Sequence, residues 1–198
     1  MKFFRPSFSY PLSAAALAAS LVLPAHAVDI DGVHLDDATK VANTDLKLNG
    51  AGIRTKIIFK VYAAGLYLTE KKSTVQEVLD AKGPRRVELV MLRDISSADF
   101  TEAFLHGLSA NADNSEKARL AGPTVKFGSL FTDTGILKKG DVVRVDWLPG
   151  SGTLVQLNGK SLSEPLPDLA FYNALLKIWL GDNPADARLK TQLLGAKG

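Results

Sequence analysis

The sequence contains no cysteine and only three histidines, and these absences exclude several kinds of site. Without cysteine there is no disulfide, no thiol nucleophile, no iron–sulfur cluster and no thiolate metal site. His34 and His106 lack an acidic partner at ligand spacing, so we expect no metal centre. The nucleophile-elbow, phosphate-loop and dinucleotide-binding motifs are missing too, so we expect no cofactor. The residues alone therefore identify no catalytic residue.

Long hydrophobic runs are also scarce, although about 20 apolar residues are needed to cross a bilayer. The longest run, Leu12–Leu23, is rich in alanine, follows two basic residues and precedes the small residues Ala25 and Ala27. This order predicts a signal peptide over residues 1–27, cleaved after Ala27, with a membrane anchor as the alternative. We therefore expect a periplasmic or secreted protein of residues 28–198, with no membrane span after cleavage.

An excess of charge is absent once the predicted signal peptide is set aside. That segment holds two of the 24 basic residues and none of the 21 acidic ones, so the net charge falls from +3 to +1. A nucleic-acid binder would show a basic excess and a basic stripe, so we expect no nucleic-acid partner. The rest of the chain has no internal repeat and no long linker, which indicates one domain over residues 28–198.

The pattern of apolar residues predicts strands before and after a group of helices. Ile53–Leu68 is the most β-rich stretch, and the Asn158-Gly159 pair predicts a hairpin turn near the end of the sheet. Val28–Leu35 is expected as a first strand with a kink at Gly32. The expected later strands are Asp141–Leu148, Thr153–Leu157 and Ser161–Leu166. The expected helices include one opened by Ser96, one around Ser115–Leu120 stopped by Gly122-Pro123, Asp168–Leu180 and Ala185–Leu194. This order predicts an α+β fold with an antiparallel sheet.

Three segments carry a family resemblance. They are Gly50–Glu70 (GAGIRTKIIFKVYAAGLYLTE), Gly140–Lys160 (GDVVRVDWLPGSGTLVQLNGK) and Asn173–Gly195 (NALLKIWLGDNPADARLKTQLLG). Together they resemble the bacterial exported branch of the chalcone isomerase-like family, and the resemblance covers essentially all of Val28–Gly195. It implies an open-faced β-sandwich, with a large antiparallel sheet, helices packed on one face and a ligand cleft between them.

The resemblance to the plant chalcone isomerases is incomplete where their chemistry occurs. Those enzymes use an arginine near the GAGIR position, a threonine in the next strand, and a tyrosine and an asparagine from a helix. Arg54 matches the arginine, but Tyr62 stands at the threonine position, Phe100 near the tyrosine, and His106 or Gly107 near the asparagine. Because aimed donors are needed to stabilise an oxyanion, we do not expect chalcone cyclisation.

Arg54 and Tyr62 look more like the pair with which the fatty-acid-binding branch of the family holds a carboxylate. A guanidinium forks onto a carboxylate, and an apolar cleft accepts the tail. We therefore expect a non-catalytic binder of a small apolar, fatty-acid-like ligand, with Phe100 and Phe104 lining the cleft or, alternatively, packing in the core. An intramolecular lyase or isomerase acting on another substrate, and an interaction module with a vestigial cleft, are the other hypotheses.

One geometric condition applies to this pair. Eight residues of continuous strand span about 26 Å at ~3.3 Å each, which is too far for one carboxylate. Arg54 and Tyr62 converge only if a turn or a bulge lies between them. Otherwise they belong to a solvated basic face together with Lys56 and Lys60. The sequence leaves both interpretations open, along with the ligand's identity and the oligomeric state.

Overall fold

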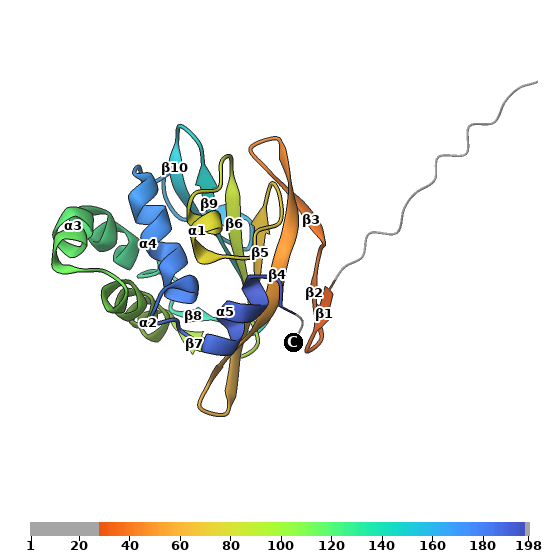
Figure 1. The fold of residues 1–198 in the computed structure, drawn as a ribbon. Coiled ribbons are helices and arrows are strands. Elements are labelled where there is room, and N and C mark those ends of the chain that lie inside the picture. The colour runs from red at the N-terminus through yellow and green to blue at the C-terminus, as the bar shows by residue number, and fades with distance from the viewer. Residues whose placement is uncertain (1–27, 197–198) are drawn as a thin grey trace, which may run out of the picture.

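The computed structural model describes residues 28–196, so the signal peptide expected over residues 1–27 lies outside the described residues. A seven-stranded antiparallel sheet forms the centre of the fold (Figure 1). Across the sheet, the strands are β11 (Lys160–Ser161), β10 (Gly152–Leu157), β9 (Val142–Leu148), β6 (Arg85–Met91), β5 (Phe59–Leu68), β4 (Thr44–Lys56) and β3 (Ala38–Val41). Two small sheets of two strands each accompany it. One is the hairpin of β1 (Val28–Ile30) and β2 (Val33–Leu35), and the other pairs β7 (Ile95–Ser96) with β8 (Ile136–Leu137), on either side of two helices in the chain.

Helices cover one face of the sheet, as Figure 1 shows. They are α1 (Val75–Leu79), α2 (Ser97–Ala110), α3 (Asn114–Ser129), α4 (Leu169–Leu180) and α5 (Ala187–Leu193). The predicted α+β fold, a large antiparallel sheet with helices packed on one face, is confirmed. Among the described residues, no helix has the length and apolar character required to cross a membrane.

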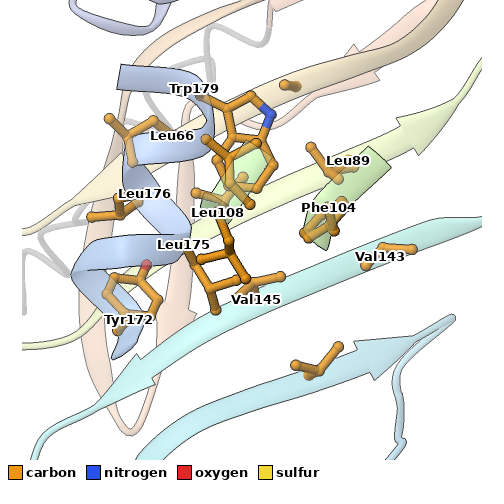
Figure 2. Packing of buried hydrophobic residues seen from close by; sticks show 14 of the residues in the cluster. Leu66, Leu89, Phe104, Leu108, Val143, Val145, Tyr172, Leu175, Leu176 and Trp179 are labelled. Carbon is orange, nitrogen blue, oxygen red and sulfur yellow. The ribbon is translucent and has the colours of Figure 1, made fainter. Parts of the chain in front are cut away.

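Helix α4 supplies the centre of the core. Its apolar residues recur at helical spacing, so one side of the helix is buried toward the sheet, and Leu175 and Trp179 share one hydrophobic cluster with Leu89 of β6 and Val145 of β9 (Figure 2). Asp168 caps its N-terminus by accepting from the backbone N–H of Ala170 at 2.7 Å.

The opposite face of the sheet carries paired charges in place of helices. Arg86 faces Asp146 across β6 and β9 and binds its carboxylate through two hydrogen bonds of 2.7 Å. Glu88 faces Arg144 in the same two strands and forms the next ion pair. The alternation of β9 thus places Val143 and Val145 in the core and Arg144 and Asp146 on the other face, as the sequence pattern predicts.

Several predicted element boundaries are wrong. The β-rich stretch Ile53–Leu68 is divided between two strands, because β4 ends at Lys56 and β5 begins at Phe59. Helix α3 does not stop at Gly122-Pro123; it continues through Pro123 to Ser129, since a proline removes one hydrogen bond and neighbouring bonds hold the helix. The kink at Gly32 is the turn of the β1–β2 hairpin. The strand expected over Ser161–Leu166 is reduced to β11 and one bridge between Leu166 and Thr153.

Candidate functional site

The β4–β5 hairpin forms one wall of the candidate site. Its two strands reverse at Ile57 and Ile58, and the register places Arg54 directly opposite Tyr62. A shift in register follows at Thr55, which marks a β-bulge on the turn side of this pair. Both the turn and the bulge that convergence requires are therefore present. The interpretation of these residues as a continuous solvated face fails, because Tyr62 is only 2% exposed.

Two glycines in β4 allow helix α5 to lie against this wall. A Cβ on Gly50 would stand 2.0 Å from the backbone oxygen of Gln192, and one on Gly52 would stand 2.1 Å from the Gln192 side chain. Only glycine at these two positions leaves room for α5 to lie this close to β4. The same contact brings Asp186 to the hairpin, where its carboxylate accepts from the backbone N–H of Thr55 at 2.9 Å.

Tyr62 connects the hairpin to the helical layer. Its hydroxyl accepts a hydrogen bond of 2.8 Å from the indole Nε1–H of Trp179. Burial raises the pKa of Tyr62, and the charge of Arg54 and the bond from Trp179 offset only part of this rise. The Tyr62 phenol is therefore neutral at physiological pH.

Arg54 lies above the ring of Tyr62, with its Cζ atom 5.6 Å from the ring centroid. Its Nε–H is buried and has no hydrogen-bond acceptor in the protein. Within the described chain, no carboxylate forms an ion pair with Arg54. The nearby Asp186 is occupied with the backbone N–H groups of Thr55, Arg188 and Leu189. The Arg54 guanidinium, held in place and without an anionic partner, is available to bind an anion from outside the protein.

A cavity of 1090 Å³ opens beside Arg54, between the hairpin and helix α2. Its volume lies slightly above the range of about 300–1,000 Å³ that small-molecule sites occupy. Apolar and charged groups share its wall. The apolar part is formed by Ile57, Phe59, Val61, Ile95, Ala103, Ala110, Pro184 and Ala185. The polar and charged part includes Arg54, Lys56, Arg93, Asp94, Ser96, Asp99, Glu102, His106 and Asn183.

The structure separates the four residues that the sequence proposes as ligand-binding. Arg54 lines the cavity, and Tyr62 lies beneath Arg54 without lining it. Phe100 and Phe104 are 2% and 3% exposed and belong to the core. Their rings pack against each other with centroids 4.7 Å apart, and Phe104 also meets Trp179 edge to face at 5.5 Å. Both phenylalanines therefore occupy the packing position that was the alternative to lining the cleft.

Some residues of the site carry a weak signal in the sequence. Trp179 reads as an ordinary core residue of α4, because its bond to Tyr62 spans 117 positions. His106 is an isolated histidine on the exposed side of α2, and only the approach of the hairpin makes it part of a cavity wall. Arg93 is placed there by stacking, with its Cζ atom 4.9 Å from the centroid of the Phe59 ring. Within residues 28–196, no cluster of three acidic or histidine side chains has the arrangement of a metal site.

The family model for chalcone isomerase-like proteins matches residues 27–195. The chain belongs to the chalcone isomerase-like family. Among solved structures, this family member is similar to a fatty-acid binding protein from Arabidopsis thaliana, with a TM-score of 0.70 and 16% identity. The likeness covers 85% of this chain and 96% of the plant protein, and at this identity it establishes the shared fold. No curated protein matches the chain.

Family membership allows the residues of the site to be compared with those of the plant chalcone isomerases. Arg54 stands where the chalcone isomerase-like resemblance places the reactive arginine, and it lines the cavity. The position near the helical tyrosine holds Phe100, which has no hydroxyl and lies in the core. The positions near the helical asparagine hold His106 and Gly107, which both line the cavity. The site thus keeps the cationic Arg54 of the family and lacks the tyrosine hydroxyl that the plant enzymes have.

Proposed function

We propose that this protein is an exported, non-catalytic member of the bacterial exported branch of the family, and that it binds a small, mostly apolar ligand bearing a carboxylate. The observation that carries the proposal is the state of Arg54. Its guanidinium lines a large cavity, its Nε–H has no acceptor, and no acidic side chain of residues 28–196 neutralises it. A carboxylate complements this group in both charge and geometry.

The apolar part of the cavity wall favours a ligand with a hydrocarbon tail. Val61 precedes Tyr62, the residue opposite Arg54, and Phe59 and Ile57 continue the apolar surface along the hairpin toward its turn. Ile95 adds a further apolar side chain to the wall. A fatty-acid-like ligand is the simplest molecule with one anionic end and one apolar end. The structural neighbour from Arabidopsis thaliana is a fatty-acid binding protein, which supports the same class of ligand.

The positions of the polar groups favour binding over catalysis. Tyr62, the acid that a lyase or isomerase mechanism would use, does not line the cavity, and its hydroxyl is engaged by Trp179. Burial keeps its pKa above the ordinary value, so it holds its proton. Tyr62 therefore serves as a support beneath Arg54. An interaction module with a filled, vestigial cleft fits less well, because the cavity is open and its cation is unpaired.

Native mass spectrometry of the protein purified from the periplasm tests this function. We expect a co-purified amphipathic acid that is present in the native protein and absent from the Arg54→Ala variant. Arg119→Ala is the matched control, because Arg119 is an exposed arginine of α3 that does not line the cavity. The control is expected to retain the ligand.

Titration with a fluorescent long-chain fatty acid gives the corresponding affinity. Loss of a charge-assisted hydrogen-bonded pair is expected to weaken binding at least about tenfold in Arg54→Ala. Equal affinity in Arg54→Ala and Arg119→Ala would overturn the carboxylate site. Recovery of a chemically altered product from a panel of enones would instead establish an enzyme.

A further inference from the structure

The tip of the β4–β5 hairpin exposes three consecutive large apolar side chains. Ile57 is 87% exposed, Ile58 is 78% exposed and Phe59 is 53% exposed. The two isoleucines are the most exposed large apolar residues within residues 28–196. Figure 1 shows this hairpin extending past the other strands as a gold loop at the bottom of the view. Exposure of these apolar side chains to water is unfavourable, and grouped exposed apolar residues mark interaction sites.

The turn itself is built against the usual preferences. Ile57 has φ +60°, in the left-handed region that β-branched residues strongly avoid. The other two-residue turns between strands of residues 28–196 use Asp31-Gly32, Ala42-Asn43 and Asn158-Gly159 in such conformations. Two isoleucines at this turn therefore serve neither solubility nor backbone geometry. Strain of this kind points to a function for the side chains.

Positive charges surround the tip. The hairpin from Ile53 to Tyr62 contains Arg54, Lys56 and Lys60 and no acidic residue, while Arg93 stacks on Phe59. Lys60 is paired with Asp31, and Lys56 has no ion-pair partner among the described residues. Three acidic residues also line the cavity: Asp94, which follows Arg93, and Asp99 and Glu102 on helix α2.

We propose that the Ile57–Phe59 tip inserts into the surface of an anionic lipid bilayer. Apolar side chains then enter the boundary of the acyl chains while the flanking cations meet the lipid phosphates. The tip is small and convex, whereas a stable protein interface needs about 800 Å² on each partner. A membrane surface therefore suits it better than a second protein.

The tip lies at the cavity, so contact of the tip with a membrane would bring the cavity to the lipid surface. Lys56, Ile57 and Phe59 line the same cavity as Arg54. A lipid-derived acid could pass from the bilayer along the hairpin to Arg54 without crossing bulk water. This last step rests on the proposed function, whereas the membrane contact does not depend on it.

Sedimentation with lipid vesicles tests the contact. The native protein is expected to bind vesicles that contain phosphatidylglycerol, and to bind less at higher salt because salt screens the charges. Ile58→Asn is expected to reduce the partition coefficient roughly tenfold, since it removes one inserted apolar side chain. Val125→Asn is the matched control, because Val125 is 74% exposed on α3. It is expected to bind as the native protein does.

The failures of the two proposals are distinguishable. Ile58 does not line the cavity, so Ile58→Asn is expected to keep its affinity for a fluorescent fatty acid in vesicle-free solution. Arg54→Ala removes one flanking cation but no inserted apolar side chain, so it is expected to weaken vesicle binding less than Ile58→Asn does, while it loses the fatty acid. Equal vesicle binding by the native protein and Ile58→Asn overturns the membrane contact, and so does an absence of vesicle binding. A change in oligomeric state on Ile58→Asn, with unchanged vesicle binding, would make the tip a contact between two copies of the chain.

Discussion

The indole Nε1–H of Trp179 donates a hydrogen bond of 2.8 Å to the hydroxyl of Tyr62, in a part of the protein where both side chains are almost fully buried. This bond joins helix α4 to strand β5 directly beneath Arg54. It fixes the ring on which the guanidinium lies. The candidate site is therefore stabilised from the core side by a residue that touches no part of the cavity.

Removal of the Tyr62 hydroxyl is expected to affect stability more than binding. Tyr62→Phe leaves the buried Trp179 donor without an acceptor, which costs about 1–3 kcal/mol in free energy of unfolding. The affinity for a fluorescent fatty acid should stay within about threefold, because the hydroxyl does not line the cavity. Urea unfolding and ligand titration of the same variant measure the two effects. A large loss of affinity at unchanged stability would show that the hydroxyl contacts the ligand.

The geometry of the guanidinium is tested by Arg54→Lys. This variant keeps a positive charge but loses the planar fork that binds a carboxylate through two bonds. We expect an affinity about three- to fivefold below that of the native protein, and above that of Arg54→Ala. If the lysine variant binds as tightly as the native protein, charge alone holds the ligand.

Two glycine substitutions are expected to change stability in opposite directions. Gly50→Ala would force a Cβ to within 2.0 Å of the Gln192 oxygen, so β4 and α5 must separate, at about 1–3 kcal/mol. Gly128→Ala lies inside helix α3, where the added Cβ meets only ordinary contacts, the nearest at 3.6 Å from Leu105 Cδ1. It should raise the free energy of unfolding by about 0.5–1 kcal/mol, as an alanine does in a helix. Chemical denaturation of both variants measures the difference, and equal effects would contradict the close approach of α5.

The strained turn predicts a stabilising substitution. Ile57→Gly relieves the positive φ of Ile57 and should raise the free energy of unfolding by about 1 kcal/mol. Ile58→Gly is the matched control, because Ile58 does not have a positive φ and gains no such relief. Thermal unfolding of the two variants is the measurement. A native-like or lower stability of Ile57→Gly would mean that the exposed isoleucine contributes to folding itself.

Stability at alkaline pH should depend on buried tyrosines. Burial raises the pKa values of Tyr62, Tyr67 and Tyr172 above the ordinary value of about 10. In the folded state these groups keep protons that the unfolded chain releases. The contribution is therefore fully present below about pH 10 and is lost as the pH rises beyond it. Ultraviolet titration of tyrosinate should show ionisation together with unfolding, whereas ionisation near pH 10 in an intact fold would contradict the burial.

The sequence by itself determined the features that depend on neighbouring residues. Alternation along β9 and the Asn158-Gly159 turn predict the antiparallel sheet, because strand period and turn conformation are local properties. Ser96 and Asp168 mark helix starts for the same reason, since a cap satisfies backbone groups within one turn. The three segments that resemble the chalcone isomerase-like family led to the correct fold.

The tertiary structure alone decided the site. Arg54 and Tyr62 converge because the chain turns at Ile57 and Ile58, which carry none of the usual turn residues. Phe100 and Phe104 share a helix face that is compatible with a cleft as well as with a core, and packing against Phe127, Phe131 and Trp179 assigns them to the core. These contacts join residues far apart in the chain, so no local pattern encodes them. The meeting of Arg54 with a cavity is a property of the folded chain.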